Sequence, residues 1–416
     1  MRAEGGDESA LVRLSGVVGL CGAWDRCEGR GFVGQGSRIV NPTMWLVLAG
    51  ALEQPQSFPD KCKRQAEAFK TRIESEILSG AYIDPDAGKR SFASYVANWI
   101  QGQAPDPASR EVIERQIRAR LVRFFGSMTM ERAAQPSSVR DWLEWLRQDP
   151  KVGVNYQAQL FDLLSSILSG AVADKLIREN PMRSGSIKRP TPVPHKAVPW
   201  DASRCSAVKA AMPARQRIAV DLGTGLGMRQ GEILGFSPDD IETTDDGTIV
   251  HIQRQARIVG GELVFRLPKG RKTRIVPLSD ALRDEISEHA RKYPAVPVTL
   301  PWDRPGGKPV TARLLLVRAP GQAWDGRTFN AQAWRPAFTN AGLAHRGRID
   351  GMHALRHTFA STLLAAGVTV RELADYLGHK DPGFTLRVYT HLLPSSHDRA
   401  RAAIDAQLTA NDASAA

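Results

Sequence analysis

The sequence predicts a multidomain, mainly α-helical protein whose C-terminal α+β part carries one small antiparallel sheet. Three observations predict this fold class. Apolar residues recur at helical spacing between residues 90 and 180. A basic, proline-rich stretch then interrupts the pattern. Further along, Gly260-Gly261 separates two segments with alternating apolar residues, as in a β-hairpin. A chain of 416 residues is long enough for two or three domains with their own cores.

Charge and composition narrow the classes of partner. Lys and Arg together number 56 against 44 Asp and Glu, a net charge of +12 that favours a polyanion such as nucleic acid, although a merely basic protein would share it. The longest apolar run, residues 44–52, is about half of what a bilayer span needs. Its four cysteines, at positions 21, 27, 62 and 205, share no metal-ligand spacing. We therefore expect a soluble, cytoplasmic protein without a membrane partner.

The N-terminal region divides into two segments. Residues 1–60 are rich in glycine and show neither helical nor alternating periodicity, so the sequence assigns them no structure. Residues 61–89 are predicted to form an amphipathic helix up to Gly80, followed by a connector.

Residues 90–180 are predicted to form a compact helical domain, with helices at 92–100, 109–125, 138–146 and 156–177. The second of these helices carries five arginines, among them Arg115 and Arg118, on a face that is either solvated or turned to DNA. A basic proline-rich linker, 181–198, contains Lys188 and Arg189 and precedes a domain predicted at 199–410.

The stretch HALRHTFASTLLAAGVTVRELADYLGHKDPGFTLRVYTHL, residues 353–392, gathers many polar groups on short helices. A first helix begins at His353, and Thr369 with Glu372 forms a capping box for a second helix that ends before His379. Pro382 then begins a third helix, which carries Tyr389. We expect the polar side chains of these helices to converge.

Metal binding is one interpretation of this cluster, because His353 and His357 are four residues apart. The zinc motif with that spacing requires a glutamate after the first histidine, where this chain has Ala354, and Arg356 would oppose a cation. The sequence therefore predicts no metal site. An interpretation in which each histidine is an ordinary surface or core residue is weakened by the clustering.

A phosphate-centred site explains the cluster better. Upstream, Arg229 and Glu232 are three residues apart at the start of a helix, where the carboxylate either orients the guanidinium or forms a surface ion pair. Two arginines, Arg229 and Arg356, could bind phosphate oxygens in bidentate fashion. Tyr389 could then supply an oxygen nucleophile, provided that a base or a strong positive field assists it.

Four motifs in order, GLGMRQGE, LPKGRKTRIVPL, HALRHTFAS and DYLGHKDPGFTLRVYTHL, resemble the successive motifs of tyrosine recombinases, the phage integrase family, over about residues 199–400. The resemblance implies that Arg229 and Arg356 bind the scissile phosphate. It also implies that Tyr389 attacks the phosphate to form a 3′-phosphotyrosyl link, that His353 assists proton transfer and that His379 contacts the phosphate.

The resemblance assigns three further residues. Lys269 best matches the family's lysine, which protonates the departing 5′-oxygen, with Lys272 as a rival for this role. Glu232 matches a supporting acidic residue, and His357 matches a frequent motif residue with a structural role.

For the remaining chain, the resemblance implies a helical, SAM-like core-binding domain at 90–180 that closes with the catalytic domain around double-stranded DNA. This favours Arg115, Arg118, Lys188 and Arg189 as DNA contacts. Residues 1–60 lack the basic strands of the family's arm-binding domain. They are either a divergent or truncated form of it, or the true start of the protein differs, and we predict no arm site.

The sequence is accordingly interpreted as a bacterial phage or mobile-element integrase that requires neither nucleotide cofactor nor metal, because no carboxylates cluster as two-metal chemistry requires. Family resemblance implies a homotetramer on DNA and accessory DNA-bending and directionality factors. Two alternatives stay open: a catalytically silent DNA-binding regulator, and a topoisomerase-like strand transferase of type IB.

Overall fold

The computed structural model describes residues 20–21, 43–47, 53–57, 86–103, 106–193 and 197–389, with isolated positions in 68–84 and 401–405. The chain divides into two compact units. Unit 1 comprises residues 1–102 and 120–190, and unit 2 comprises residues 103–119 and 191–416. The predicted mainly helical, multidomain fold class with small antiparallel sheets is confirmed. Among the described residues, none of the helices combines the length and apolarity that crossing a membrane requires.

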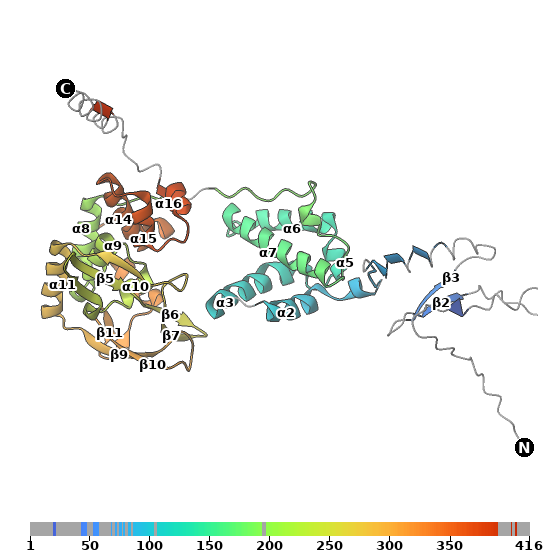
Figure 1. Ribbon diagram of the computed structural model, residues 1–416, viewed down its shortest axis with the longest axis horizontal. Helices are drawn as coiled ribbons and strands as arrows, with labels where there is room; N and C mark the ends of the chain where they lie inside the picture. Colours follow the sequence, from blue (N-terminus) through green and yellow to red (C-terminus); the bar gives the residue numbers. More distant parts are fainter. Residues whose placement is uncertain are drawn as a thin grey trace, which may run out of the picture. The chain divides into compact units, whose positions relative to one another are not determined.

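Unit 1 consists mainly of helices (Figure 1). The helices predicted at 92–100, 138–146 and 156–177 are confirmed, with small shifts at their ends. They are α2 (Phe92–Gly102), α6 (Pro136–Gln148) and α7 (Val154–Ala173). The helix predicted at 109–125 begins as α3 (Pro107–Gln116), whose residues belong to unit 2, and continues through a π-helical turn, Ile117–Val122, into α4 (Arg123–Phe125) of unit 1. Three short elements, the 3₁₀ turn Ala87–Lys89, α5 (Met130–Ala133) and the 3₁₀ turn Pro181–Arg183, complete the described helical part of the unit.

An aromatic cluster forms the core of unit 1. The Phe125 ring lies 5.3 Å from the ring of Phe92 and 5.7 Å from that of Trp142. Pro136 occupies the first turn of α6, where its missing N–H costs no hydrogen bond, and α6 then buries one face that includes Trp142 and Leu146. Burial of this apolar face, more than intrinsic helix propensity, holds such short helices together.

The N-terminal segment departs from the sequence analysis, which found no periodicity there. Three short strands, β1 (Leu20–Cys21), β2 (Thr43–Val47) and β3 (Glu53–Ser57), pair as an antiparallel sheet in the order β1-β2-β3. The sequence analysis assigned this segment no structure, and the three strands contain no lysine or arginine. Strands of two to five residues are too short for alternation to stand out. The helix predicted at 61–80 falls largely outside the described residues.

The strands of unit 2 form small antiparallel sheets. The Gly260-Gly261 turn between β6 (Gln255–Val259) and β7 (Glu262–Arg266) is confirmed, and both glycines have positive φ. A further strand, β8 (Arg274–Pro277), pairs with β5 (Gly247–Ile252) in a sheet of order β4-β5-β8, in which β4 is Ile241–Thr244. Two further hairpins pair β9 (Val296–Pro301) with β10 (Pro309–Leu314) and β11 (Val317–Ala319) with β12 (Gln322–Ala323).

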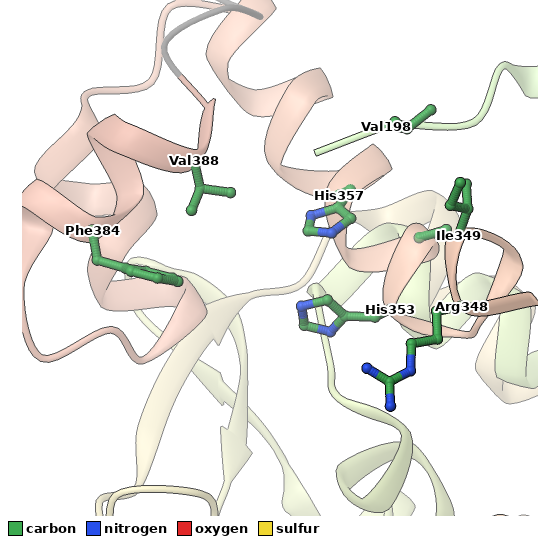
Figure 2. Close-up of a pocket in the computed structure, with 8 residues that line it drawn as sticks. Val198, Arg348, Ile349, His353, His357, Phe384 and Val388 are labelled. Carbon is green, nitrogen blue, oxygen red and sulfur yellow. The ribbon is translucent and has the colours of Figure 1, made fainter. Parts of the chain in front are cut away.

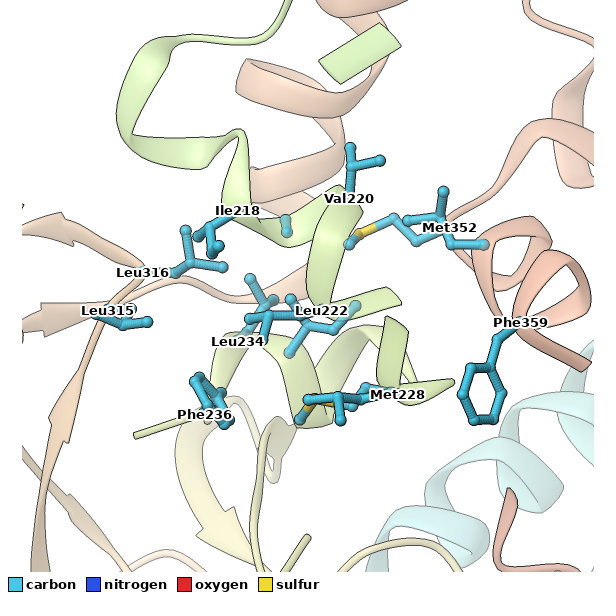
Figure 3. Packing of buried hydrophobic residues seen from close by; sticks show 14 of the residues in the cluster. Ile218, Val220, Leu222, Met228, Leu234, Phe236, Leu315, Leu316, Met352 and Phe359 are labelled. Atoms are coloured by element: carbon cyan, nitrogen blue, oxygen red, sulfur yellow. The ribbon is translucent and has the colours of Figure 1, made fainter. Parts of the chain in front are cut away.

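Helices supply most of the core of unit 2. They are α8 (Ala202–Ala211), α9 (Ile218–Leu226), α10 (Gln230–Leu234), α11 (Asp280–Lys292), α12 (Gly326–Phe329), α13 (Arg335–Asn340), α14 (His353–Ala365), α15 (Val370–Leu377) and α16 (Pro382–Tyr389). Figure 3 shows Leu222 of α9 and Leu234 of α10 packed in this core, with Met228 between the two helices in sequence. All three side chains are almost completely buried.

Two glycines bring α9 close to α14. A Cβ atom on Gly223 would lie 2.6 Å from a side-chain atom of Leu355, which is closer than real contacts allow. Gly227 ends α9 in the left-handed conformation with φ of 58° and lies against Phe359. The glycine-rich GTGLGMR stretch therefore allows α9 to pack closely against α14 rather than forming a nucleotide-binding loop. It also positions Arg229 beside Arg356 of α14.

Candidate active site

Glu232 is the anchor of the site in unit 2. Its carboxylate is completely buried and accepts hydrogen bonds from the backbone N–H of Arg229 at 2.8 Å and from the Nη1 of Arg229 at 3.0 Å. The predicted pair is therefore present, and it is the orienting contact rather than a surface ion pair. Burial alone would raise the pKa of Glu232, but the charges of Arg274 and Arg229 outweigh it and lower that pKa to about 2.

Arg274, the first residue of β8, is a site residue that the sequence analysis did not single out. Its Nη1 and Nη2 donate to the two carboxylate oxygens of Glu232 at 3.0 and 2.7 Å, and its Nε donates to the carbonyl oxygen of Tyr376 at 2.7 Å. This arginine therefore ties α10, β8 and α15 together. The available signal was an arginine at the start of an otherwise apolar strand.

Arg356 lies on α14 and is completely buried. Its Nη1 donates to the carbonyl oxygen of Gly227 at 2.8 Å, and its Nη2 donates to the carbonyl oxygen of Leu377. Arg229 donates to the same Leu377 oxygen at 3.3 Å, so one carbonyl holds two guanidinium groups side by side. Burial and the nearby charges of Arg229 and Arg274 lower the pKa of Arg356 to about 9.

The Nε–H of Arg356 is a buried donor that has no hydrogen-bond partner in the part of the chain that the structure describes. Buried donors are rarely left unpaired, because each costs about 1–3 kcal/mol. A donor of this kind beside a second arginine is suited to an anion with several oxygens, such as a phosphodiester.

His379 follows α15 directly after Gly378, which has the left-handed conformation of a helix C-cap. Its Nε2 lies 3.1 Å from the Nη2 of Arg356, which can only donate, so Nε2 accepts and the proton resides on Nδ1. That Nδ1–H donates to the hydroxyl of Thr385, at 2.6 Å. Burial, followed by the charges of Arg356 and Arg229, lowers the pKa of His379 to about 3. Thr385 is completely buried, and the sequence analysis did not single it out.

His353 begins α14, and its ring packs edge-on against that of His357 with the centroids 4.7 Å apart. Although His353 is exposed, the protein atoms around its ring and the charge of Arg356 lower its pKa to about 4. Lys269 is among the charges that act on this ring. Both Lys269 and its rival Lys272 are exposed on the β7–β8 connection.

Tyr389 ends α16 and is 2% exposed. Its hydroxyl lies 2.9 Å from the Nδ1 of His357. Burial raises the pKa of Tyr389 to about 12, although Arg356 and Arg229 act in the opposite direction. The structure thus brings Arg229, Arg356, His353, His379 and Tyr389 together in one site.

The predicted DNA contacts are surface residues of their own units. Arg115, Arg118, Lys188 and Arg189 are all exposed. Arg189 is engaged within unit 1, where its Nε and Nη2 donate to the carboxylate of Asp162 at 2.7 and 2.6 Å. A DNA phosphate would compete with that carboxylate. Among the described residues, no group of three His, Cys, Asp or Glu side chains has the arrangement of a metal site.

Comparison with known proteins identifies the class of this site. The model of the phage integrase family matches residues 204–396. The chain is 27% identical over 363 residues to a prophage phiRv2 integrase of Mycobacterium tuberculosis, covering 86% of this chain and 89% of the relative. Residues 204–396 are therefore a phage integrase family domain, and the chain is a site-specific recombinase.

Solved structures agree with this fold. The Tn1549 transposon integrase in complex with transposon right end DNA aligns with a TM-score of 0.60 at 17% identity. The alignment covers 77% of this chain and 100% of the transposon integrase chain. A lambda integrase tetramer bound to a Holliday junction aligns with a TM-score of 0.53 at 15% identity, over 82% of this chain and 94% of that one.

Proposed function

We propose that this recombinase cuts and rejoins DNA through a covalent 3′-phosphotyrosyl link formed by Tyr389, as an integrase of a bacterial phage or mobile element. The observation that carries the proposal is the Nε–H of the buried Arg356, which has no hydrogen-bond partner among the described residues and lies beside Arg229 and Tyr389. A phosphodiester supplies the acceptor oxygens that this donor lacks, and it would place a phosphorus atom near the phenol.

Each side chain has a role in this reaction. Arg229 and Arg356 bind the non-bridging oxygens and stabilise the negative charge that develops on them. Glu232 accepts a hydrogen bond from Arg229 and is itself fixed by Arg274, so the two residues together hold Arg229 in place. His353 and His379, which are neutral at pH 7 in the free protein, can contact phosphate oxygens or carry a proton. Lys269 gives a proton to the departing 5′-oxygen.

DNA binding extends beyond the site in this proposal. The exposed Arg115, Arg118, Lys188 and Arg189 would contact the phosphate backbone, which makes affinity steeply dependent on salt. Four copies would assemble on two DNA sites, by analogy with the lambda integrase tetramer. Accessory DNA-bending and directionality factors stay a prediction from family resemblance.

The test traps the covalent intermediate on nicked, labelled duplex DNA that carries the element's candidate attachment core, in EDTA. Wild type should form a protein–DNA adduct on a denaturing gel, and Tyr389→Phe should bind the DNA but form none, because the nucleophilic oxygen is gone. Tight binding without an adduct from either protein would instead support a silent DNA-binding regulator. An adduct that requires a divalent metal would contradict a site built from arginine and lysine.

A DNA substrate with a bridging sulfur in place of the 5′-oxygen tests whether Lys269 or Lys272 protonates the leaving group. Lys269→Ala should slow cleavage by about 10²–10⁴-fold, because the 5′-oxygen leaves without a proton donor. A bridging sulfur in place of that oxygen leaves without protonation and should restore the rate. Lys272→Ala is the matched control and should cleave both substrates at the wild-type rate. If Lys272→Ala shows the defect and its rescue, the assignment is reversed.

A further inference from the structure

His357 is the side chain that contacts the hydroxyl of Tyr389. The 2.9 Å separation between its Nδ1 and the Tyr389 oxygen is that of a hydrogen bond. The two rings meet edge-on with their centroids 5.6 Å apart. Family resemblance gave His357 a structural role, whereas this contact places it on the reacting atom itself.

The other two histidines of the site are arranged differently. Both nitrogens of His379 are engaged, since Nε2 accepts from Arg356 and Nδ1 donates to Thr385. His353 packs against the ring of His357, and within the described residues no hydrogen bond joins it to Tyr389. The imidazole placed to receive a proton from the phenol is therefore that of His357.

The chemistry of Tyr389 requires such a partner. Because burial raises its pKa to about 12, the phenol is protonated at neutral pH. Its O–H bond must break as the oxygen bonds to phosphorus, and the guanidinium groups around the site are already protonated, so they cannot accept this proton. A neutral imidazole nitrogen in hydrogen-bond contact can take this proton directly.

We propose that His357 is a catalytic residue that orients the Tyr389 hydroxyl and takes its proton through Nδ1 during attack on the DNA. The inference rests on the proposed function. In this step the Tyr389 O–H bond breaks and its proton moves to His357, the phenol oxygen bonds to phosphorus, and the bond from phosphorus to the 5′-oxygen breaks. Lys269 gives that oxygen a proton. On rejoining, His357 returns the proton to Tyr389.

A cavity of about 260 Å³ beside His357 suits this role. Figure 2 shows His353 and His357 projecting from α14, with Arg348 below them and Val388 across the space. His353, Arg348, Tyr389 and His379 are titratable or charged side chains near His357. The opening gives a transient imidazolium access to water and leaves room for a small molecule.

Chemical rescue tests the proposal through that cavity. His357→Ala should slow adduct formation in single-turnover reactions by about 10²–10⁴-fold while DNA affinity is unchanged. Added imidazole should restore the rate at least about tenfold, because it can enter the vacated space and accept the proton. Wild type should not respond to imidazole. His251→Asn, an exposed histidine that pairs with Glu242, is the matched control and should cleave normally.

His357→Asn separates proton acceptance from positioning. Its amide oxygen can still accept a hydrogen bond from Tyr389 but cannot take the proton, so this variant should be nearly as slow as His357→Ala. Replacing Tyr389 by a more acidic fluorotyrosine should then speed it. A rate for His357→Asn within about threefold of wild type, or failure of both rescues, would overturn the proposal. If wild type itself formed no adduct, the proposed function would fail, and this inference with it.

Discussion

Units 1 and 2 differ in the polar side chains that they bury. Among the described residues, unit 1 buries Gln157 and Asn180, which are neutral amides satisfied by backbone and serine groups. Unit 2 buries six charged side chains: Glu232, Asp240, Arg266, Arg274, Asp350 and Arg356. Burying an ion costs several kcal/mol unless a partner compensates. Among the described residues, the desolvation cost of burying an ion therefore arises at six positions in unit 2 and at none in unit 1.

Partners explain most of the buried charges in unit 2. Asp240 pairs with Arg254, Asp350 with Arg346 and Arg204, Arg266 with Asp106 and Asp303, and Glu232 with Arg229 and Arg274. Arg356 is the exception within the described residues, because its partners are two carbonyl oxygens and a histidine. The comparison indicates that paired charges support the fold, whereas Arg356, which has no carboxylate partner among the described residues, is the charge that we propose binds a DNA phosphate.

Breaking a paired charge should have the largest effect on stability. Arg274→Met leaves the buried Glu232 with Arg229 as its remaining cationic partner. We expect a loss of about 3–5 kcal/mol in the free energy of unfolding, measured by denaturant titration. The control is Arg291→Met, which removes a pair that is largely exposed and should cost at most about 1 kcal/mol. Equal costs for both variants would show that burial does not distinguish these pairs.

Adding a charge to unit 1 should have an intermediate effect. Asn180 donates to the carbonyl oxygen of Ser165 at 2.9 Å and to the hydroxyl of Ser169 at 2.8 Å. Asn180→Asp replaces that donor with a carboxylate oxygen, at an expected cost of about 1–3 kcal/mol. Hydrogen exchange should show faster opening in α7 while α14 and α15 keep their protection. A neutral result would mean that unit 1 tolerates charge as unit 2 does.

Removing the charge of Arg356 should have the smallest effect on stability. Arg356→Met relieves the desolvation cost of the guanidinium but loses its bonds to Gly227 and Leu377. We expect the free energy of unfolding to change by at most about 1 kcal/mol, while adduct formation is lost. A cost as large as that of Arg274→Met would place Arg356 among the structural charges.

Local patterns in the sequence were sufficient for much of the fold and the site. The capping box is present, since the backbone N–H of Glu372 donates to Thr369 at 3.2 Å and its carboxylate accepts from the Thr369 N–H at 3.0 Å. Pro382 begins α16 as expected. These signals succeed because capping and helical periodicity depend on residues a few positions apart. The order of the motifs likewise identified the residues that meet around Arg356.

Only the tertiary structure decided which distant groups share an environment. The sequence could not show that β8 pairs with β5, that Arg274 supports Glu232, or that His357 contacts Tyr389. The paired residues of β5 and β8 are 22 to 28 positions apart in the sequence, Glu232 and Arg274 are 42 apart, and His357 and Tyr389 are 32 apart, so no local pattern encodes these contacts. The sequence by itself determined which chemical groups the protein has and the short helices that carry them. Packing between helices and strands then determined which of the buried charges among the described residues have an oppositely charged partner and which, like Arg356, do not.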